Sequence, residues 1–451
     1  MCAALKSDLC VDEAQATLLQ IASMYGEIDA FIDGLQEWSA PQKVDTPAAL
    51  LPASSYVQAQ PKGVVLVLGA WNYPFNVTIG PAACAIAAGN CVVIKPSELA
   101  PETAKVMERI FSRLDQRAVH CVLGGAEVAA ELVSSSFDHI VYTGGSRVAR
   151  LILSAAAQNL TPVTLELGGK SPVIICDGIN LSEACKRVVA AKFTNTGQTC
   201  IAPDYILVER GIRDKVVELM VKAAHDMLGE SSHKSSHYGR LVNGQAAERL
   251  QACLRESHGG KVLIGGADVP QDTAEGHRYV HPTLVLDPVK DSRLLNDEIF
   301  GPILPIVTVE SHEEATAYIN SKPKPLALYV FAPDKVAEKV LEKTTSGGAI
   351  VGDALVHKGN PNLPFGGIGN SGTGRMHGRR GFLELSNERA VMYRPLFMPS
   401  PLTLPVNASL AKAAYAYATM RPGKALGKHA LKIIAALIPF ILMWLRRRRL
   451  L

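Results

Sequence analysis

The sequence lacks the features that mark several large classes of protein. No unit of about 20 to 50 residues recurs along its 451 residues, which excludes a repeat array. Aromatic residues make up 6% of the chain and charged residues 20%, whereas 48% is hydrophobic and 37 glycines and 27 prolines are spread along it. This composition excludes a disordered or collagen-like chain. We therefore expect a globular protein whose length allows a core of two or three domains.

The chain also lacks a marked excess of charge and any ordered spacing of cysteine. Its 46 basic and 42 acidic residues give a net charge of +4, and residues 446–449 are four arginines. The rest of the chain is therefore neutral, and we expect no nucleic-acid partner. The nine cysteines are odd in number and no two have C-x-x-C spacing, so neither a disulfide framework nor a metal site is expected.

The two ends of the sequence differ. The start lacks the basic and apolar regions of a signal peptide, which predicts a body in the cytosol. Residues 431–445 are apolar apart from Lys432 and are followed at once by the four arginines. A helix of these 15 residues would span about 22 Å, short of the ~30 Å hydrocarbon core of a bilayer. A short membrane anchor and a helix that lies in the membrane interface are therefore both open.

Hydrophobic spacing predicts the main elements of the body. An N-terminal helix is expected, because apolar residues recur in steps of three and four, as on one buried helix face: Leu18, Ile21, Tyr25, Ile28, Ile32 and Leu35. Apolar runs at 64–71 and 91–95 flank a helical stretch at 78–88, the pattern of two buried parallel strands joined by a crossover helix.

The alternation continues, with a change of unit after residue 167. Short strands are expected near 120–125 and 139–144, with a helix at 149–159, which completes a doubly wound α/β unit over 1–167. A second α/β domain over 168–365 begins with a strand at 173–176, a helix at 182–193 and a strand at 205–210. From residue 399 the composition turns to Ala, Lys and Pro, which indicates a linker over 399–430 before the tail at 431–451.

One cysteine lies in a stretch of sequence that suits a reactive residue. Cys200 ends the stretch Asn195-Thr-Gly-Gln-Thr-Cys200, a polar, glycine-containing turn between a helix and a strand. A reactive cysteine needs a position where its thiolate is stabilised and its target can approach, and this turn is predicted to offer one. The other eight cysteines are better explained as small core residues.

Six motifs occur in order over residues 1 to about 395. Through these motifs the sequence resembles the aldehyde dehydrogenase superfamily. Details of the motifs and the hydrophobic tail are similar to the class 3 branch, which includes fatty aldehyde dehydrogenases. The motifs are Trp71-Asn-Tyr-Pro-Phe, Lys95-Pro-Ser-Glu98, Leu165-Glu-Leu-Gly-Gly-Lys170, Gly-Gln-Thr-Cys200, Glu298-Ile-Phe-Gly-Pro302 and Leu363-Pro-Phe-Gly-Gly-Ile-Gly-Asn370.

The resemblance implies roles for four catalytic residues. Cys200 would attack the aldehyde, and Asn72 with the backbone N–H of Cys200 would stabilise the oxyanion of the thiohemiacetal. Glu166 would activate the water that hydrolyses the thioester, and Glu298 would contact the nicotinamide ribose and could share the duty of base. The alternatives are that Asn72 is a turn residue and that Glu298 is a capping acid on a solvated turn.

The resemblance also implies a site for NAD. The strand-turn-helix at 143–150 would place Gly144 and Ser146 at the phosphates, with Ala149 where the family has a second glycine. Lys95 and Glu98 would hold the adenosine ribose, which favours NAD, with NADP also possible. Lys-Pro-Ser-Glu also suits a helix N-terminus, and both readings can hold. Phe300 would contact the cofactor beside Glu298. His377 is expected at the surface, near three arginines.

The resemblance predicts a membrane-attached enzyme that oxidises medium- to long-chain aliphatic aldehydes to carboxylic acids. A bridging and oligomerisation segment over 366–398 would make it a homodimer, anchored to the endoplasmic reticulum or to the mitochondrial outer membrane or peroxisome. One rival is a CoA-acylating dehydrogenase, which usually lacks the base at 166. A second is a non-catalytic binding scaffold, which would not need Cys200, Glu166, Glu298 and Asn72 together.

Overall fold

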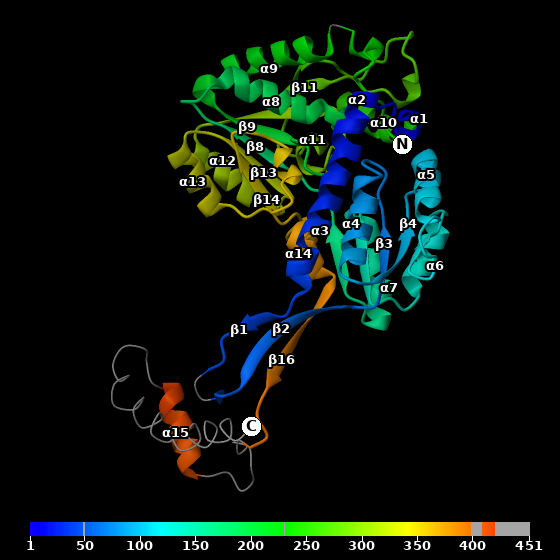
Figure 1. The fold of residues 1–451 in the computed structure, drawn as a ribbon. Helices are drawn as coiled ribbons and strands as arrows, with labels where there is room; N and C mark the ends of the chain where they lie inside the picture. Colours follow the sequence, from blue (N-terminus) through cyan, green and yellow to red (C-terminus); the bar gives the residue numbers. More distant parts are fainter. Residues whose placement is uncertain (48–49, 230, 398–407, 420–451) are drawn as a thin grey trace. The chain divides into compact units, whose positions relative to one another are not determined.

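The computed structural model describes residues 1–47, 50–229, 231–397 and 408–419 (Figure 1). Contacts along the chain divide it into one unit of residues 1–42 and 57–390 and another of residues 43–56 and 391–451. The tail predicted at 431–451 lies outside the described residues. In the part of the chain that the structure describes, no helix has both the length and the apolar character needed to cross a membrane.

The first sheet confirms the predicted doubly wound pattern. It has the order β15-β7-β6-β3-β4-β5, in which β15 (Gly372–Thr373) is antiparallel and the others are parallel. Helices pack on both faces, because alternate strand residues point to opposite sides. The remaining strands are β3 (Val64–Leu68), β4 (Cys91–Lys95), β5 (Val119–Cys121), β6 (His139–Thr143) and β7 (Val163–Glu166), and the helices are α4 (Asn76–Ala87), α5 (Pro101–Phe111), α6 (Ala126–Ser134) and α7 (Ser146–Ala156).

The strand order creates a crevice at one edge of this sheet. The chain runs outward from β3 to β4 and β5, and then returns to β6 on the other side of β3. The loops that follow β3 and β6 therefore diverge, and open α/β sheets bind ligands at such a switch point beside the carboxyl ends of their strands. Asn72, Lys95 and Gly144 all lie in segments at or just past these strand ends.

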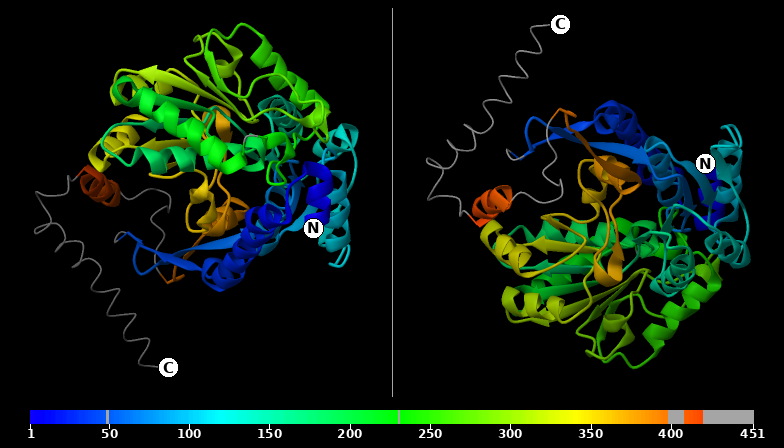
Figure 2. Two further views of the ribbon diagram at one scale, coloured as in Figure 1. Left: turned by 90° about the horizontal axis from the view of Figure 1, so that it is seen from above. Right: turned by 90° about the horizontal axis from the view of Figure 1, so that it is seen from below.

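The second sheet confirms the second α/β domain fold. Its order is β10-β11-β12-β9-β8-β13-β14, parallel except that β10 is antiparallel to β11. Val173 and Ile175 of β8 pack with α8 and α9, whereas Ile174 packs with α12 and α13. These two pairs of helices cover opposite faces of the sheet (Figures 1 and 2). The bounds are β8 (Pro172–Ile175), α8 (Leu181–Phe193), β9 (Tyr205–Glu209), α9 (Arg213–Leu228), α10 (Gly244–Arg255), β10 (Lys261–Ile264), β11 (Thr283–Leu286), α11 (Arg293–Asn296), β12 (Ile303–Val309), α12 (His312–Asn320), β13 (Ala327–Phe331), α13 (Asp334–Lys343) and β14 (Gly348–Val351).

The remaining elements include the N-terminal helices and a third sheet. That sheet has three strands in the order β1-β2-β16. The rings of Tyr56 and Tyr393 stack with their centroids 6.0 Å apart. The bounds are α1 (Cys2–Leu9), α2 (Glu13–Ala16), the π-helical turn η1 (Thr17–Ala22), α3 (Ser23–Ser39), β1 (Gln42–Val44), β2 (Ser54–Pro61), α14 (Gly378–Glu384), β16 (Ser386–Tyr393) and α15 (Ala408–Thr419).

The predicted N-terminal helix exists, but its predicted buried face is wrong. Leu18 is 70% exposed and Ile32 66%, whereas Met24 and Phe31 are buried against α4 and α14. The buried stripe is offset by about one residue, which turns it by roughly 100°. Gln20 belongs to this stripe, because its side chain accepts a hydrogen bond from the Phe75 backbone N–H at 3.3 Å. A buried polar residue is not visible to a count of apolar spacing.

The cap predicted at Lys-Pro-Ser-Glu is also wrong. Helix α5 begins at Pro101, and its N-cap, Ala100, has no side-chain acceptor. The acceptor comes instead from α1, where the Asp8 carboxylate receives the backbone N–H groups of Glu102 and Thr103 at 3.2 and 2.8 Å. A carboxylate distant in sequence satisfies the orphan donors of the helix, as a local cap would do.

Candidate active site

A cavity of about 410 Å³ brings three of the predicted catalytic residues together. Asn72, from the loop after β3, Glu166, at the end of β7, and Cys200, from the turn before β9, all line it. The remaining wall is largely apolar, and includes Leu18, Val77, Ile201, Val356, Phe365 and Met376.

The Cys200 turn is held in an unusual backbone conformation. Asn195, Thr196 and Gly197 have φ of 50°, 55° and 74°, so the chain makes a left-handed twist after α8. A Cβ at Gly197 would lie 2.2 Å from the Gly301 carbonyl oxygen, so only glycine fits there. Such strain persists where surrounding structure fixes it, and it is typical of functional sites.

Asn72 is part of the structure that fixes the turn. Its side chain is 4% exposed, and its Nδ2 donates to the Gln198 carbonyl oxygen at 3.1 Å. In return, Asn195 Nδ2 donates to the Asn72 carbonyl oxygen at 2.8 Å. An amide nitrogen carries two N–H groups, so a second N–H of Asn72 remains for an oxyanion beside Cys200.

Glu166 lines the cavity with its carboxylate group buried. Its side chain is 6% exposed, and neither carboxylate oxygen has a hydrogen-bond donor among the residues that the structure describes. Burial raises the pKa of Glu166 well above its usual value, with a smaller opposing effect from Arg375 and a further rise from Glu384. A carboxylate with a raised proton affinity suits a general base.

The surroundings of Cys200 oppose its ionisation more than the turn favours it. Burial, together with the negative charges of Glu166 and Glu298, raises the pKa of Cys200 to about 12, whereas the charge of Lys358 and the backbone N–H of Cys200 oppose this rise. The thiol is therefore the main form at neutral pH, and the reactive thiolate is the minor one.

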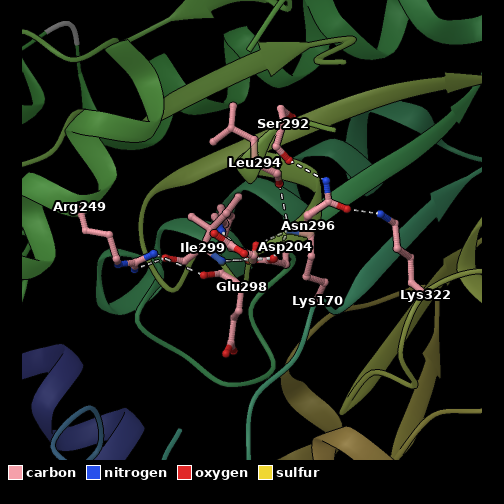
Figure 3. Close-up of polar contacts among 11 residues, drawn as sticks. Lys170, Asp204, Arg249, Ser292, Leu294, Asn296, Glu298, Ile299 and Lys322 are labelled. Carbon is pink, nitrogen blue, oxygen red and sulfur yellow. Dashed lines mark hydrogen bonds and ion pairs between the residues drawn. The ribbon is translucent and has the colours of Figure 1, made fainter. Parts of the chain in front are cut away.

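Glu298 lies in a segment whose backbone is held by a network of polar contacts (Figure 3). The buried ion pair between Lys170 and Asp204 has an N–O distance of 2.6 Å, and the Asp204 carboxylate also receives the Ile299 N–H at 3.2 Å. Arg249 donates to the Ile299 carbonyl oxygen at 2.6 Å. Lys170 also donates to the Asp297 carbonyl oxygen at 2.9 Å, so the backbone is held on both sides of Glu298.

The carboxylate of Glu298 points away from this network (Figure 3). It lies against Gly168, where an added Cβ would be 2.2 Å from Glu298 Oε1. Burial, with the charge of Asp204, raises the pKa of Glu298 to about 7, although Lys170 and Arg249 oppose the rise. The described lining of the Cys200 cavity does not include Glu298, so the two glutamates occupy different surroundings.

The residues predicted to bind a dinucleotide lie at the carboxyl edge of the first sheet. Lys95 is buried at the end of β4, and its Nζ lies 3.0 Å from Glu98 Oε2. Gly144 follows β6, and Ser146 is the first residue of α7, whose N-terminal N–H groups suit a phosphate. A Cβ at Gly145 would meet nothing within 4 Å, so open space adjoins this terminus. The residues present therefore fit a dinucleotide.

Two further residues bear on the predicted dinucleotide site. Ala149 is 2% exposed and packs in the core of the first sheet, so the core accommodates the methyl group that alanine has where the family has glycine. Phe300 has a φ of 49°, and its ring meets Trp71 edge-on with centroids 5.5 Å apart. That contact joins the loop after β3 to the segment that carries Glu298.

The prediction that His377 lies at the surface is wrong. Its side chain is 12% exposed and its ring stacks on Phe365, with centroids 5.0 Å apart and planes 14° apart. Its Nε2 lies 3.7 Å from Glu27 Oε1, and both residues line the cavity. Sequence reasoning missed Glu27 and Lys358 as well, because neither belongs to a recognised motif.

Comparisons with known proteins agree with this geometry. The profile of the Aldehyde dehydrogenase family matches residues 6–391. The "Aldehyde dehydrogenase, dimeric NADP-preferring" of Canis lupus familiaris is 43% identical over 411 residues, which cover 91% of this chain and 89% of that protein. The "4,4'-diaponeurosporen-aldehyde dehydrogenase" of Staphylococcus aureus (strain NCTC 8325 / PS 47) is 39% identical, with 89% of this chain and 87% of that protein covered.

The fold has close counterparts among solved structures. The structure titled "Substrate bound state of Staphylococcus Aureus AldH" has a TM-score of 0.87 and 37% identity, and covers 92% of this chain and 90% of that chain. The "Aldehyde dehydrogenase family 3 member A2" of Macaca fascicularis is 41% identical, over 87% of this chain and 80% of that protein. The chain belongs to the aldehyde dehydrogenase family, whose members oxidise aldehydes with NAD or NADP, and the predicted resemblance to the class 3 branch is confirmed.

Proposed function

We propose that this protein oxidises medium- to long-chain aliphatic aldehydes to carboxylic acids with NAD or NADP, through a thiohemiacetal and a thioester on Cys200. The observation that supports this most is the meeting of Cys200, Asn72 and Glu166 in one cavity with largely apolar walls. The nucleophile, the oxyanion donor and the base that such a reaction needs are thus within one enclosed space.

The residues perform the first step by addition and proton transfer. The Cys200 thiol loses its proton to solvent, and the thiolate adds to the carbonyl carbon of the aldehyde. The free N–H of Asn72 and the backbone N–H of Cys200 then donate to the oxyanion. A bound nicotinamide would supply the hydride acceptor that the thiohemiacetal needs in order to become a thioester.

Glu166 acts in hydrolysis. Once the thioester exists, the Glu166 carboxylate takes a proton from water, and the resulting hydroxide attacks the acyl carbon. The acid is released, and the departing Cys200 thiolate takes the proton back from Glu166. Glu298 has a separate duty in this account: its carboxylate orients the cofactor from the wall that the Lys170 and Asp204 pair supports.

The cofactor would be held by Lys95, Glu98, Gly144, Ser146 and Phe300. The Glu98 carboxylate accepts hydrogen bonds from a free ribose hydroxyl and repels a phosphate at that position, which favours NAD. Lys95 lies 3.0 Å from that carboxylate and can offset its charge, so NADP remains a usable cofactor. The name of the dog relative, "NADP-preferring", supports the second cofactor.

The apolar walls support aliphatic substrates. The name of the Staphylococcus aureus relative refers to diaponeurosporen-aldehyde. NADH formation should therefore be measured over a series of straight-chain aldehydes from three to sixteen carbons. We expect kcat/KM to rise with chain length, because each buried methylene contributes about 0.8 kcal/mol. A series in which kcat/KM falls beyond four carbons would contradict the proposed substrate class.

The assignment of the nucleophile has a matched control. Cys200→Ala should abolish NADH formation while NADH still binds, as measured by fluorescence. Cys253 is buried in α10 and does not line the cavity, so Cys253→Ala should keep the wild-type rate. Turnover of Cys200→Ala at the wild-type rate would show that the nucleophile lies elsewhere.

The partners and location proposed for this protein rest on the sequence and on relatives. The name "dimeric" of the dog enzyme supports a homodimer. The apolar residues 431–445 with their arginines support attachment to a membrane, with the endoplasmic reticulum favoured by resemblance over the mitochondrial outer membrane or peroxisome. Fractionation of cells should find the protein in the membrane pellet until detergent is added, and recovery in the soluble fraction would contradict the anchor.

A further inference from the structure

A lysine lies in the wall of the Cys200 cavity. Lys358 belongs to the short 3-10 helix η8 (Val356–Gly359), and it lines the same cavity as Cys200. Its Nζ donates to Ser23 Oγ at 3.2 Å, and Asn76 Nδ2 lies 3.2 Å from the same oxygen. Residues of α3 and α4 thus fix the position of the ammonium group at the cavity wall.

The turn that carries Lys358 and the turn that carries Cys200 share a support. The hydroxyl of Tyr329, in β13, donates to the Ile201 carbonyl oxygen, next to Cys200. The ring of Tyr329 also meets the His357 ring, next to Lys358, with centroids 6.1 Å apart. Tyr329 therefore contacts the residue next to Cys200 and the residue next to Lys358, and so connects the two turns.

The charges around Cys200 are otherwise negative. Glu166, from β7, and Glu298, before β12, both disfavour a thiolate, whereas Lys358 favours it. The phenols of Tyr73 and Tyr329 face the same region, and burial raises the pKa of each, so both are neutral at physiological pH.

Lys358 supplies positive charge to this part of the cavity, because the histidines near it are neutral. His357 and His377 have pKa values lowered by burial, so neither ring adds a charge at neutral pH. Burial lowers the pKa of Lys358 as well, but the carboxylate of Glu27, on α3, and the Cys200 thiolate itself oppose that shift. The effect is therefore mutual: each charged partner stabilises the other in a space with little water.

We propose that Lys358 is a positioning residue that stabilises the Cys200 thiolate by its charge. This inference rests on the proposed role of Cys200 as the nucleophile and adds the group that makes its ionised form accessible. The hydrogen bond to Ser23 holds the ammonium group at the wall, and the carboxylate of Glu27 favours its charged form, so that the cation is in place before the aldehyde enters.

The test follows the ionisation of Cys200 by itself. Full-length protein is alkylated with iodoacetamide at pH 8, and the rate at which the peptide that contains Cys200 is modified is followed by mass spectrometry. Lys358→Arg keeps the charge, Lys358→Gln keeps a hydrogen-bond donor for Ser23 without the charge, and Lys358→Met keeps neither. We expect Arg to reproduce the wild-type rate, and Gln and Met to slow the reaction alike by about tenfold, which corresponds to about one unit in the pKa of the thiol.

The outcomes separate charge from structure. A wild-type alkylation rate in Lys358→Gln would overturn the proposal, since only the hydrogen bond would then matter, and an equal loss of rate in all three variants would overturn it by showing a packing defect. If Lys358→Met does not fold, the pair of Arg and Gln variants still decides. Activity that survives in Cys200→Ala would refute the nucleophile, whereas the alkylation rate reports on Lys358 whether or not that occurs.

Discussion

Glu166 and Glu298 are both glutamates near one cysteine, but their surroundings differ in kind. Both oxygens of Glu166 lack a hydrogen-bond donor among the residues described, whereas the backbone on the two sides of Glu298 is held by Lys170, Arg249 and Asp204. Burial raises the pKa of both, to about 7 for Glu298 and well above its usual value for Glu166. A carboxylate without a hydrogen-bond donor binds a proton readily, and a carboxylate on a fixed backbone keeps a defined position.

The largest effect is expected when the general base is removed. Glu166→Gln should lower steady-state turnover by a factor of about 10² to 10⁴, the usual contribution of a general base. A first burst of NADH should persist, because hydrolysis is the step that needs Glu166. Stopped-flow absorbance separates the burst from the steady state, and an unchanged steady-state rate would transfer the role of base away from Glu166.

The second prediction concerns the support beneath Glu298. Asp204→Ala leaves Lys170 and Lys192 buried without their counter-charge, so the free energy of unfolding should fall by about 3 to 5 kcal/mol. Urea denaturation measures the change. Asp115→Ala is the control, because it removes an exposed ion pair with Arg117 and should leave the transition midpoint where it is.

The third prediction sharpens the role of Glu298 through pH. With a pKa of about 7, its carboxyl is protonated below that pH and ionised above it. If the ionised form holds the cofactor ribose, the Kd for NADH falls as pH rises from 6 to 8. Glu298→Gln should remove this dependence and weaken binding about tenfold at pH 8, in line with the loss of a hydrogen bond to a charged group. Equal pH dependence in wild type and variant would contradict the assignment.

The fourth prediction, with the smallest expected effect, concerns the free energy of unfolding of Glu166→Gln. Glu166 has a pKa raised in the folded state, so its charged form disfavours folding above the unfolded pKa, near 4.5. Glu166→Gln should therefore raise the free energy of unfolding at pH 7.5 by about 1 to 2 kcal/mol. The gain should shrink as the pH falls toward 4.5. A variant that is less stable than wild type at pH 7.5 would show that Glu166 has a partner in solution.

Patterns within one segment predicted much of this molecule. The strands β3, β4, β6, β8 and β9 were predicted within two or three residues, because continuous apolar runs reflect burial on both faces of a parallel sheet. The polar turn with Cys200 was predicted between a helix and a strand, and the structure has it between α8 and β9.

Features made by distant segments could not be predicted in this way. The cap of α5 comes from Asp8, the buried stripe of α3 depends on α4 and α14, and the environment of His377 depends on Phe365 and Glu27. Each of these is fixed by a contact between residues far apart in the chain, which leaves no signal in local spacing or composition.

The most direct test of the account is the mass of Glu166→Gln protein after it reacts with hexanal and NAD. The account predicts that the protein gains one hexanoyl group, carried as a thioester on the peptide that contains Cys200, while Glu298→Gln treated in the same way shows no lasting adduct. Glu166→Gln that turns over without any acyl adduct, or an adduct on another residue, would contradict the proposal that Cys200 forms the thioester and that Glu166 hydrolyses it.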